Sequence, residues 1–167
     1  MKKDYLLAFF SLGICLFIYL FYRTEQTIIN QIFIAINSIE TFIEAQHTVQ
    51  KRLPLPDVIV YSLPEALWIF CITLTSKSLY LKFGKLQFNM VYLPLILIFA
   101  FEFSQLFHFT NGRFDVWDIV LSLVFWILAK SFVKSKTKDQ NMLKPFNYRT
   151  LICVFSYLIV FFSHVIY

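Results

Sequence analysis

Charged residues are scarce in this sequence. Only 15% of its 167 residues are Asp, Glu, Lys or Arg, whereas 59% are hydrophobic and 20% are aromatic. A typical soluble domain has about a quarter of its residues charged and about half of them apolar. The scarcity of charge therefore argues against a soluble fold and favours lipid-facing helices. A chain of this length forms a single domain over residues 1–167, with no room for a separate soluble catalytic module.

The sequence also lacks the spacings that mark metal sites, disulfides and nucleophilic catalysis. Its cysteines, Cys15, Cys71 and Cys153, lie far apart inside apolar runs, which is typical of small buried side chains. No HxxxH or HExxH pattern joins its histidines. Ser163 and His164 are adjacent, and adjacent residues of a helix do not face each other. We therefore expect no metal and no cofactor.

Apolar runs long enough for membrane helices are frequent. A transmembrane helix needs about 20 mostly apolar residues. The predicted spans are residues 5–22, 58–75, 90–107, 115–133 and 150–167. The first span follows two lysines, as a signal peptide would, but no small-x-small cleavage site precedes Arg23, so we interpret it as a membrane helix. The expected fold is an all-α, polytopic bundle of five transmembrane helices.

The distribution of Lys and Arg predicts the orientation of this bundle, because cytoplasmic loops carry most of these residues. With the N-terminus inside, the cytoplasmic set is Lys2, Lys3, Lys77, Lys82, Lys85, Lys130, Lys134, Lys136, Lys138, Lys144 and Arg149. The outer set is Arg23, Lys51, Arg52 and Arg113. The excess predicts an N-in, C-out, multi-pass protein of the bacterial inner membrane. The same distribution explains the excess of basic residues as a determinant of membrane topology, so no nucleic-acid partner is expected.

One long connection, residues 24–50, separates the first two spans. Isoleucines recur in it at helical spacing, at Ile28, Ile32, Ile36, Ile39 and Ile43. Polar residues lie between them, at Asn30, Asn37, Glu40, Glu44 and His47. This pattern predicts an amphipathic helix on the extracytoplasmic membrane surface, although the many β-branched residues leave a strand as the alternative. The isoleucine stripe is expected to face lipid or the bundle.

Glu65, Glu102 and Asp118 lie within predicted spans, beyond their first residues. A charged side chain in the middle of a membrane helix costs about 2.5–3.5 kcal/mol on insertion scales and usually marks function. Glu65 is seven residues from the outer end of its span, a depth of about 10 Å at about 1.5 Å per residue. Glu102 lies five residues below the outer end of the next span, and Asp118 lies three residues into the one after it. All three are therefore expected at a similar depth, in the outer half of the bundle, where they approach one another.

Three more polar residues belong to this predicted cluster. Gln105 shares a helix face with Glu102, because they are three residues apart, and Asp115 shares one with Asp118. Arg113 lies in the short link that folds the two spans into a hairpin, where it is placed to bind a carboxylate. The candidate ligand-binding residues are Glu65, Glu102, Gln105, Arg113, Asp115 and Asp118.

Each of these residues also has a purely structural interpretation. Asp115 is suited to cap the N-terminus of its helix, and Arg113 to anchor it at the membrane interface. Glu65 can bond to backbone freed by the preceding proline. Glu102 and Asp118 can form an interhelical tie, because polar side chains often hold membrane helices together.

The same stretch resembles the VanZ-like membrane proteins. The similarity lies in residues 102–105 (Glu-Phe-Ser-Gln), in residues 112–118 (Gly-Arg-Phe-Asp-Val-Trp-Asp) and in Pro64 within an earlier helix. It covers about the second to fourth spans. The family usually has Asn where Ser122 stands and Gly soon afterwards, where this chain has Phe125. The resemblance implies a small polytopic envelope protein, linked in the founding member to glycopeptide (teicoplanin) resistance.

The function favoured at this point is the binding of a lipid-linked or cell-wall-related head group in an outer-leaflet polar pocket. Membrane lipids and a lipid-linked cell-wall precursor are then the expected partners. One alternative is a small accessory subunit of a larger membrane protein complex, with other membrane proteins as partners. Another is an intramembrane hydrolase or transferase that uses Glu102 or Asp118 as a general base, although no nucleophile–base pair is visible.

Overall fold

The computed structural model describes residues 2–23, 28–36, 38–109, 113–132, 139–143 and 146–165, and within them the chain is mostly helical. Each predicted span contains a helix. These helices are α1 (Lys2–Tyr22), α5 (Leu63–Ser76), α6 (Leu93–Leu106), α7 (Val116–Phe132) and α8 (Tyr148–Val165). A short helix, α4 (Asp57–Tyr61), precedes α5, and a 3₁₀ turn, η1 (Met90–Tyr92), precedes α6.

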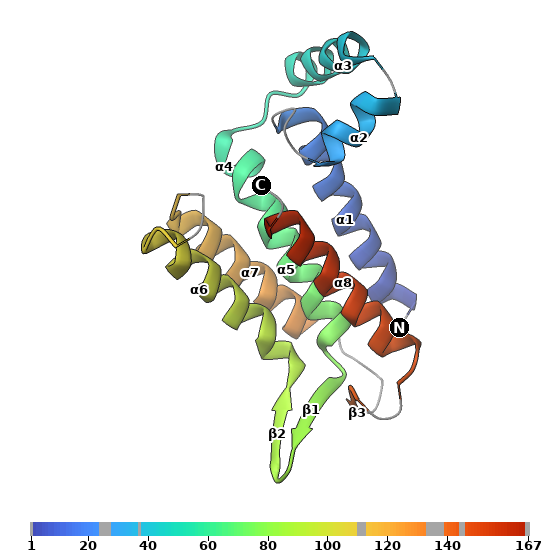
Figure 1. Cartoon of the computed structure of the whole chain (residues 1–167), viewed down its shortest axis with the longest axis vertical. Coiled ribbons are helices and arrows are strands. Elements are labelled where there is room, and N and C mark those ends of the chain that lie inside the picture. The colour runs from blue at the N-terminus through green and yellow to red at the C-terminus, as the bar shows by residue number, and fades with distance from the viewer. Residues whose placement is uncertain are drawn as a thin grey trace.

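Helix α5 is the centre of the bundle. It packs most extensively against α7 and α1 and also contacts α8 and α6 (Figure 1). Its side chains Leu67, Trp68, Ile69 and Ile72 are buried, because the sequence of this helix is apolar on every face. They form the main core with residues of α1 and α6, among them Ile98. Successive helices of the bundle alternate in direction, so each of α5, α6 and α7 runs antiparallel to the bundle helices before and after it in the chain (Figure 1).

Among the described residues, two helical stretches are long and apolar enough to cross a membrane by length and composition, Lys3–Tyr22 and Asp57–Ser76. The second combines α4 with α5. Met90–Leu106 and Tyr148–Ile159 are shorter apolar helices. The structure therefore supports a helical protein with two candidate membrane-spanning helices. The prediction of five spans is not established by this observation.

A small sheet corrects the all-α prediction. The chain between α5 and α6 forms a hairpin of β1 (Leu79–Phe83) and β2 (Leu86–Asn89), and β3 (Gln140–Asn141) pairs with β1 in parallel. The hairpin loop has two residues and begins with Gly84 at φ +60°, a conformation that glycine adopts without steric cost. The sequence analysis missed these strands, because the alternating pattern is only eleven residues long and lies between two long apolar runs that predict helices.

The long connection is helical rather than extended, as predicted. It forms α2 (Ile28–Ile36) and α3 (Ile39–Arg52), and the side chain of Ser38 caps α3 by accepting the Thr41 N–H. Of the isoleucine stripe, which was expected to face lipid or the bundle, Ile32, Ile36 and Ile39 are 57%, 76% and 47% exposed, and Ile43 is half-buried. The side chain of Ile28 lies outside the described residues. Asn37 lies outside the described residues.

Polar side chains of α2 and α3 instead face the bundle and close the end of α1. The Asn30 amide donates to the Tyr19 carbonyl at 3.2 Å, Gln46 to the Leu20 carbonyl at 2.8 Å, and Gln50 to the Phe21 carbonyl at 2.7 Å. The last carbonyls of a helix have no intrahelical donor. This need explains why Asn30, predicted on the polar outer face, is completely buried.

Candidate functional site

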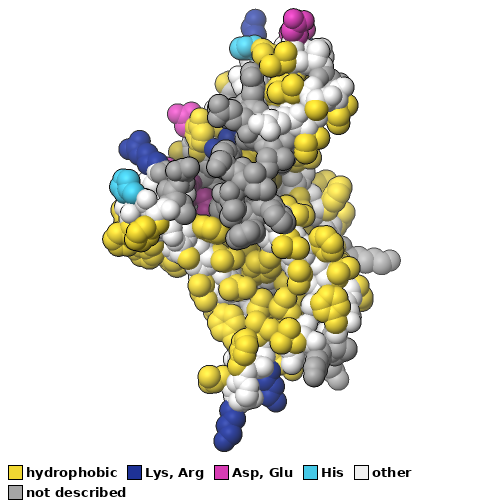
Figure 2. All heavy atoms as spheres, in the orientation of Figure 1, with side chains coloured by type: hydrophobic (Ala, Val, Ile, Leu, Met, Phe, Trp, Pro, Cys, Tyr) yellow, Lys and Arg dark blue, Asp and Glu magenta, His cyan; other side chains and the backbone are white. Residues whose placement is uncertain are grey.

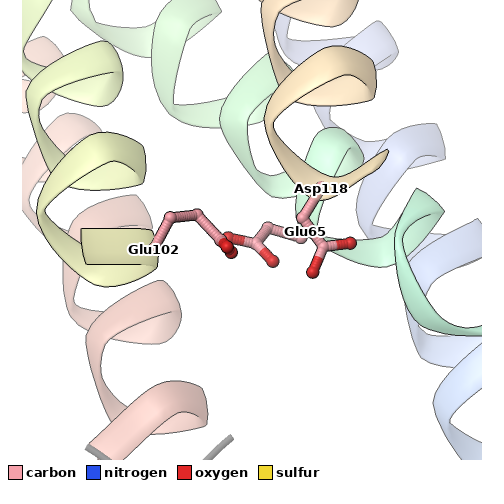
Figure 3. A group of neighbouring side chains, drawn as sticks. All are labelled: Glu65, Glu102 and Asp118. Carbon is pink, nitrogen blue, oxygen red and sulfur yellow. The ribbon is translucent and has the colours of Figure 1, made fainter. Parts of the chain in front are cut away.

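A break between α4 and α5 positions Glu65. Ser62 separates the two helices, and Pro64 lies in the first turn of α5, where its missing N–H removes no intrahelical hydrogen bond. Glu65 follows in the same turn, at the end of the helix where the dipole favours a negative charge. Its half-buried side chain extends toward carboxylates from two other helices (Figure 3).

Glu102 lies on α6 and is almost completely enclosed, with 1% of its surface exposed. Its Oε2 atom accepts the backbone N–H of Asp115 at 3.2 Å, which links the end of α6 to the start of α7. Its Oε1 atom is buried and has no hydrogen-bond partner among the described residues. Burial of an unpaired carboxylate oxygen is unfavourable, so this atom is a candidate ligand-binding atom.

Asp118 lies in the first turn of α7. Its Oδ1 atom is buried and, within the described part of the chain, accepts no hydrogen bond. Ser62 lies beside it. The Ser62 hydroxyl, on a side chain that is 1% exposed, forms no hydrogen bond of good geometry in the described ranges. Asp118 on α7 and Ser62 before α5 thus add two more buried polar atoms to the surroundings of Glu65 and Glu102.

The three carboxylates converge. One oxygen atom from each of Glu65, Glu102 and Asp118 lies within 4.8 Å of the others (Figure 3). The convergence expected from depth along the predicted spans is therefore present, whereas the role of these residues in binding stays a prediction. Two ionised carboxylates at this separation repel by about 3 kcal/mol at an effective dielectric constant of about 20. The cluster therefore needs a proton or a cation to hold its three members together.

The other three predicted site residues differ in position. Asp115 caps α7, since its Oδ1 atom accepts the Trp117 N–H at 2.9 Å, as its structural interpretation predicted. Gln105 is half-buried on α6, and its Oε1 atom has no partner within the described residues. Arg113 is exposed in the link before α7, and among the described residues it forms no ion pair with a cluster carboxylate, so its predicted contact with them is not seen. The turn at 111–112 lies outside the described residues.

Arg23 is the cation that the sequence analysis missed. It follows α1, and its guanidinium lies close enough to Asp118 to act on it electrostatically. It donates from Nη2 to the Tyr61 carbonyl at 3.1 Å. It also lies over the rings of Tyr19 and Tyr61, 5.3 Å and 4.8 Å from their centroids. Its spacing of four residues from Tyr19 is the only signal in the sequence, and such pairs are common.

A small cavity lies next to Glu65. Trp68, Ile69 and Ile72 line it from α5, and Leu97, Ile98 and Phe101 line it from α6. Its volume of about 10 Å³ is close to the space that a single water molecule occupies. A whole head group does not fit there, so a larger ligand has to approach the carboxylates from the helix ends near which they lie.

Chemically, the site offers carboxylate and hydroxyl oxygens in a largely apolar surrounding, with one guanidinium nearby. Such a set binds ligands rich in hydrogen-bond donors or positive charge. Comparisons with models of known protein families, with curated proteins and with solved structures find no match for this chain.

Proposed function

We propose that this chain is a multi-pass protein of the bacterial inner membrane, with five spans in an N-in, C-out orientation. Support comes from the helix found at each predicted span and from their alternating directions (Figure 1). Hydrophobic side chains cover the middle of the face in Figure 2, and charged side chains gather mainly toward its two ends. Such a belt matches a bilayer better than water, because large exposed apolar surfaces are rare in soluble monomers.

The orientation has a direct test. Reporter fusions at Lys82, in the β1–β2 hairpin, are expected to give a cytoplasmic signal, and fusions at Glu44, on α3, an extracytoplasmic one. The excess of Lys and Arg on one side is the physical reason. Lys138 and Gly112, which lie outside the described residues, are expected inside and outside respectively. A cytoplasmic signal at Glu44 would place the carboxylate cluster in the inner leaflet and contradict the proposal.

The proposed function is that of a VanZ-like envelope protein, which binds the polar head group of a lipid-linked or cell-wall-related molecule. The carrying observation is the convergence of Glu65, Glu102 and Asp118 from three helices, with buried oxygens of Glu102 and Asp118 unpaired among the described residues. A ligand that donates hydrogen bonds satisfies these atoms, whereas an empty cluster leaves them desolvated.

The cluster also indicates which part of the ligand it binds. Carboxylates repel phosphate, so hydroxyl, amide or ammonium groups of the head group are the expected contacts. Arg23 is the nearby cation and replaces Arg113 as the candidate contact for a phosphate or carboxylate group. This assignment places the donor-rich part of the head group at α6 and its anionic part toward the end of α1.

The substitution Glu102→Gln tests this function. It keeps the shape of the side chain, but it removes the charge and gives the side chain a donor where an acceptor is needed. We expect the variant to insert normally, to lose most of the lipid-linked precursor that copurifies with the wild type, and to lose any glycopeptide (teicoplanin) tolerance that the wild type confers. Mass spectrometry of the bound lipid and growth on the antibiotic measure both effects.

Glu44→Gln is the matched control, because Glu44 is an exposed carboxylate on α3, away from the cluster. It should bind precursor like the wild type. Equal precursor binding by Glu102→Gln would contradict head-group binding. If the protein instead copurified in fixed proportion with other membrane proteins and without lipid, the accessory-subunit alternative would be favoured.

A further inference from the structure

The carboxylates of Glu65, Glu102 and Asp118 lie close enough together to bind one metal ion, although the sequence contains no metal-binding motif. We propose that Glu65, Glu102 and Asp118 together bind one divalent cation of the class that prefers oxygen ligands, such as Mn²⁺, Mg²⁺ or Ca²⁺. Each residue comes from a different helix, α5, α6 or α7, and their carboxyl groups extend toward a common point (Figure 3).

The separations fit a single coordination sphere. Such ions bind oxygen at about 2.0–2.6 Å, so two ligands of one ion lie at most about 4–5 Å apart. One oxygen from each of the three carboxylates lies within 4.8 Å of the other two. A set made of carboxylates alone, without Cys or His, favours hard cations over zinc. Water, or oxygens of a bound ligand, would fill the remaining positions.

Atoms that lack partners point to a ligand independently of the cluster of negative charge. Glu102, with 1% of its surface exposed, has its carboxyl group beside the other carboxylates (Figure 3), and its Oε1 atom has no partner in the described residues. The buried Oδ1 atom of Asp118 likewise has no partner in the same part of the chain, and the equally buried Ser62 hydroxyl lies beside Asp118 without a hydrogen bond of good geometry. Buried polar atoms are nearly always bonded in native proteins, and a hydrated cation supplies both a positive charge and donors.

The charges agree with this assignment. Among the described residues, Arg23 acts electrostatically on Asp118, but its guanidinium is already bonded to the Tyr61 carbonyl and placed over two aromatic rings. A divalent cation brings the total charge of the cluster and Arg23 to zero. Binding of the ion does not rest on the proposed function.

The experiment uses the full chain in a neutral detergent, stripped with a chelator and free of precursor lipid. Titration with Mn²⁺, followed by electron paramagnetic resonance, is expected to show one saturable site per chain, with Ca²⁺ and Mg²⁺ as competitors. Glu102→Gln and Asp118→Asn should each weaken Mn²⁺ binding by about tenfold or more, since even outer-shell changes cost roughly 10–100-fold. Glu44→Gln should bind Mn²⁺ like the wild type.

A second measurement needs no variant. Mn²⁺ should raise the thermal unfolding temperature of the wild type in a saturable way, because it binds only the folded chain. Lack of both saturable binding and stabilisation in the wild type would overturn the metal site. Binding that Glu102→Gln and Asp118→Asn leave unchanged would also overturn it, by placing the ion elsewhere. Because no precursor is present, failure here is distinct from failure to bind a head group.

Discussion

Replacing Trp68 by alanine is expected to lower the free energy of unfolding by about 3–5 kcal/mol, the range for large aromatic residues in packed cores. Trp68 lies on the central helix α5 with 4% of its surface exposed. Its ring stacks on Tyr19 of α1, with centroids 5.4 Å apart and an interplanar angle of 17°. The change removes this stacking and leaves a cavity between α1, α5 and α6.

Trp117→Ala is the control for this change, since Trp117 is 54% exposed on α7. It should alter the free energy of unfolding by no more than about 0.5 kcal/mol, as exposed substitutions usually do. Unfolding in mixed micelles, followed by circular dichroism, compares the two variants. Equal losses would mean that α5 is not the packed centre of the bundle.

Replacing Arg23 by methionine is expected to lower the free energy of unfolding by about 2–3 kcal/mol. The change removes a charged hydrogen bond, worth about 1.5–3 kcal/mol, to the Tyr61 carbonyl. It also removes cation–π contacts with Tyr19 and Tyr61, which contribute about 0.5–1 kcal/mol each when partly exposed. Relief of the buried, unpaired Nε atom offsets part of this loss. The same unfolding measurement applies.

The matched variant is Arg113→Met, which removes an exposed Arg from the link before α7. Sequence reasoning favoured Arg113 as the partner of the carboxylates, so it predicts the larger loss there. The structure reverses this order. If Arg113→Met destabilised the protein more than Arg23→Met, the placement of Arg23 between its two tyrosines would be contradicted.

The helices and the meeting of the carboxylates were predictable because both depend on length and periodicity. A run of about 20 apolar residues specifies a helix, and the rise per residue then specifies how deep Glu65, Glu102 and Asp118 lie. Depth alone predicted their meeting, because residues at the same distance from one end of a bundle lie level with each other on neighbouring antiparallel helices. The capping role of Asp115 follows from its place before an apolar run, and the structure confirms it.

The cation at the site was not predictable in the same way. Which arginine approaches Asp118 depends on how α2 and α3 fold back over the end of α1, and residue spacing does not encode that path. The predicted polar face of this segment included Asn30, which instead bonds to a carbonyl of α1. Burial by tertiary contact overrode the local amphipathic pattern.

The hairpin was missed although its signal is in the sequence. Alternation in Leu79–Phe83 and Leu86–Asn89 around Gly84 is a recognisable hairpin signal, but apolar composition outweighed it. The carboxylate cluster has no linear motif, because its members come from three helices that are distant in sequence. Depth along the predicted spans, and not residue spacing, was therefore the signal that predicted it.

The amides that close the end of α1 also set an order of assembly. Asn30, Gln46 and Gln50 leave the ribosome soon after α1, so its terminal carbonyls acquire their donors while most of the bundle is still unsynthesised. The carboxylate cluster, in contrast, is complete only once Asp118 has been translated and α7 has formed. The donors that close α1 are thus available early, whereas Glu65 is translated before either of its partner carboxylates.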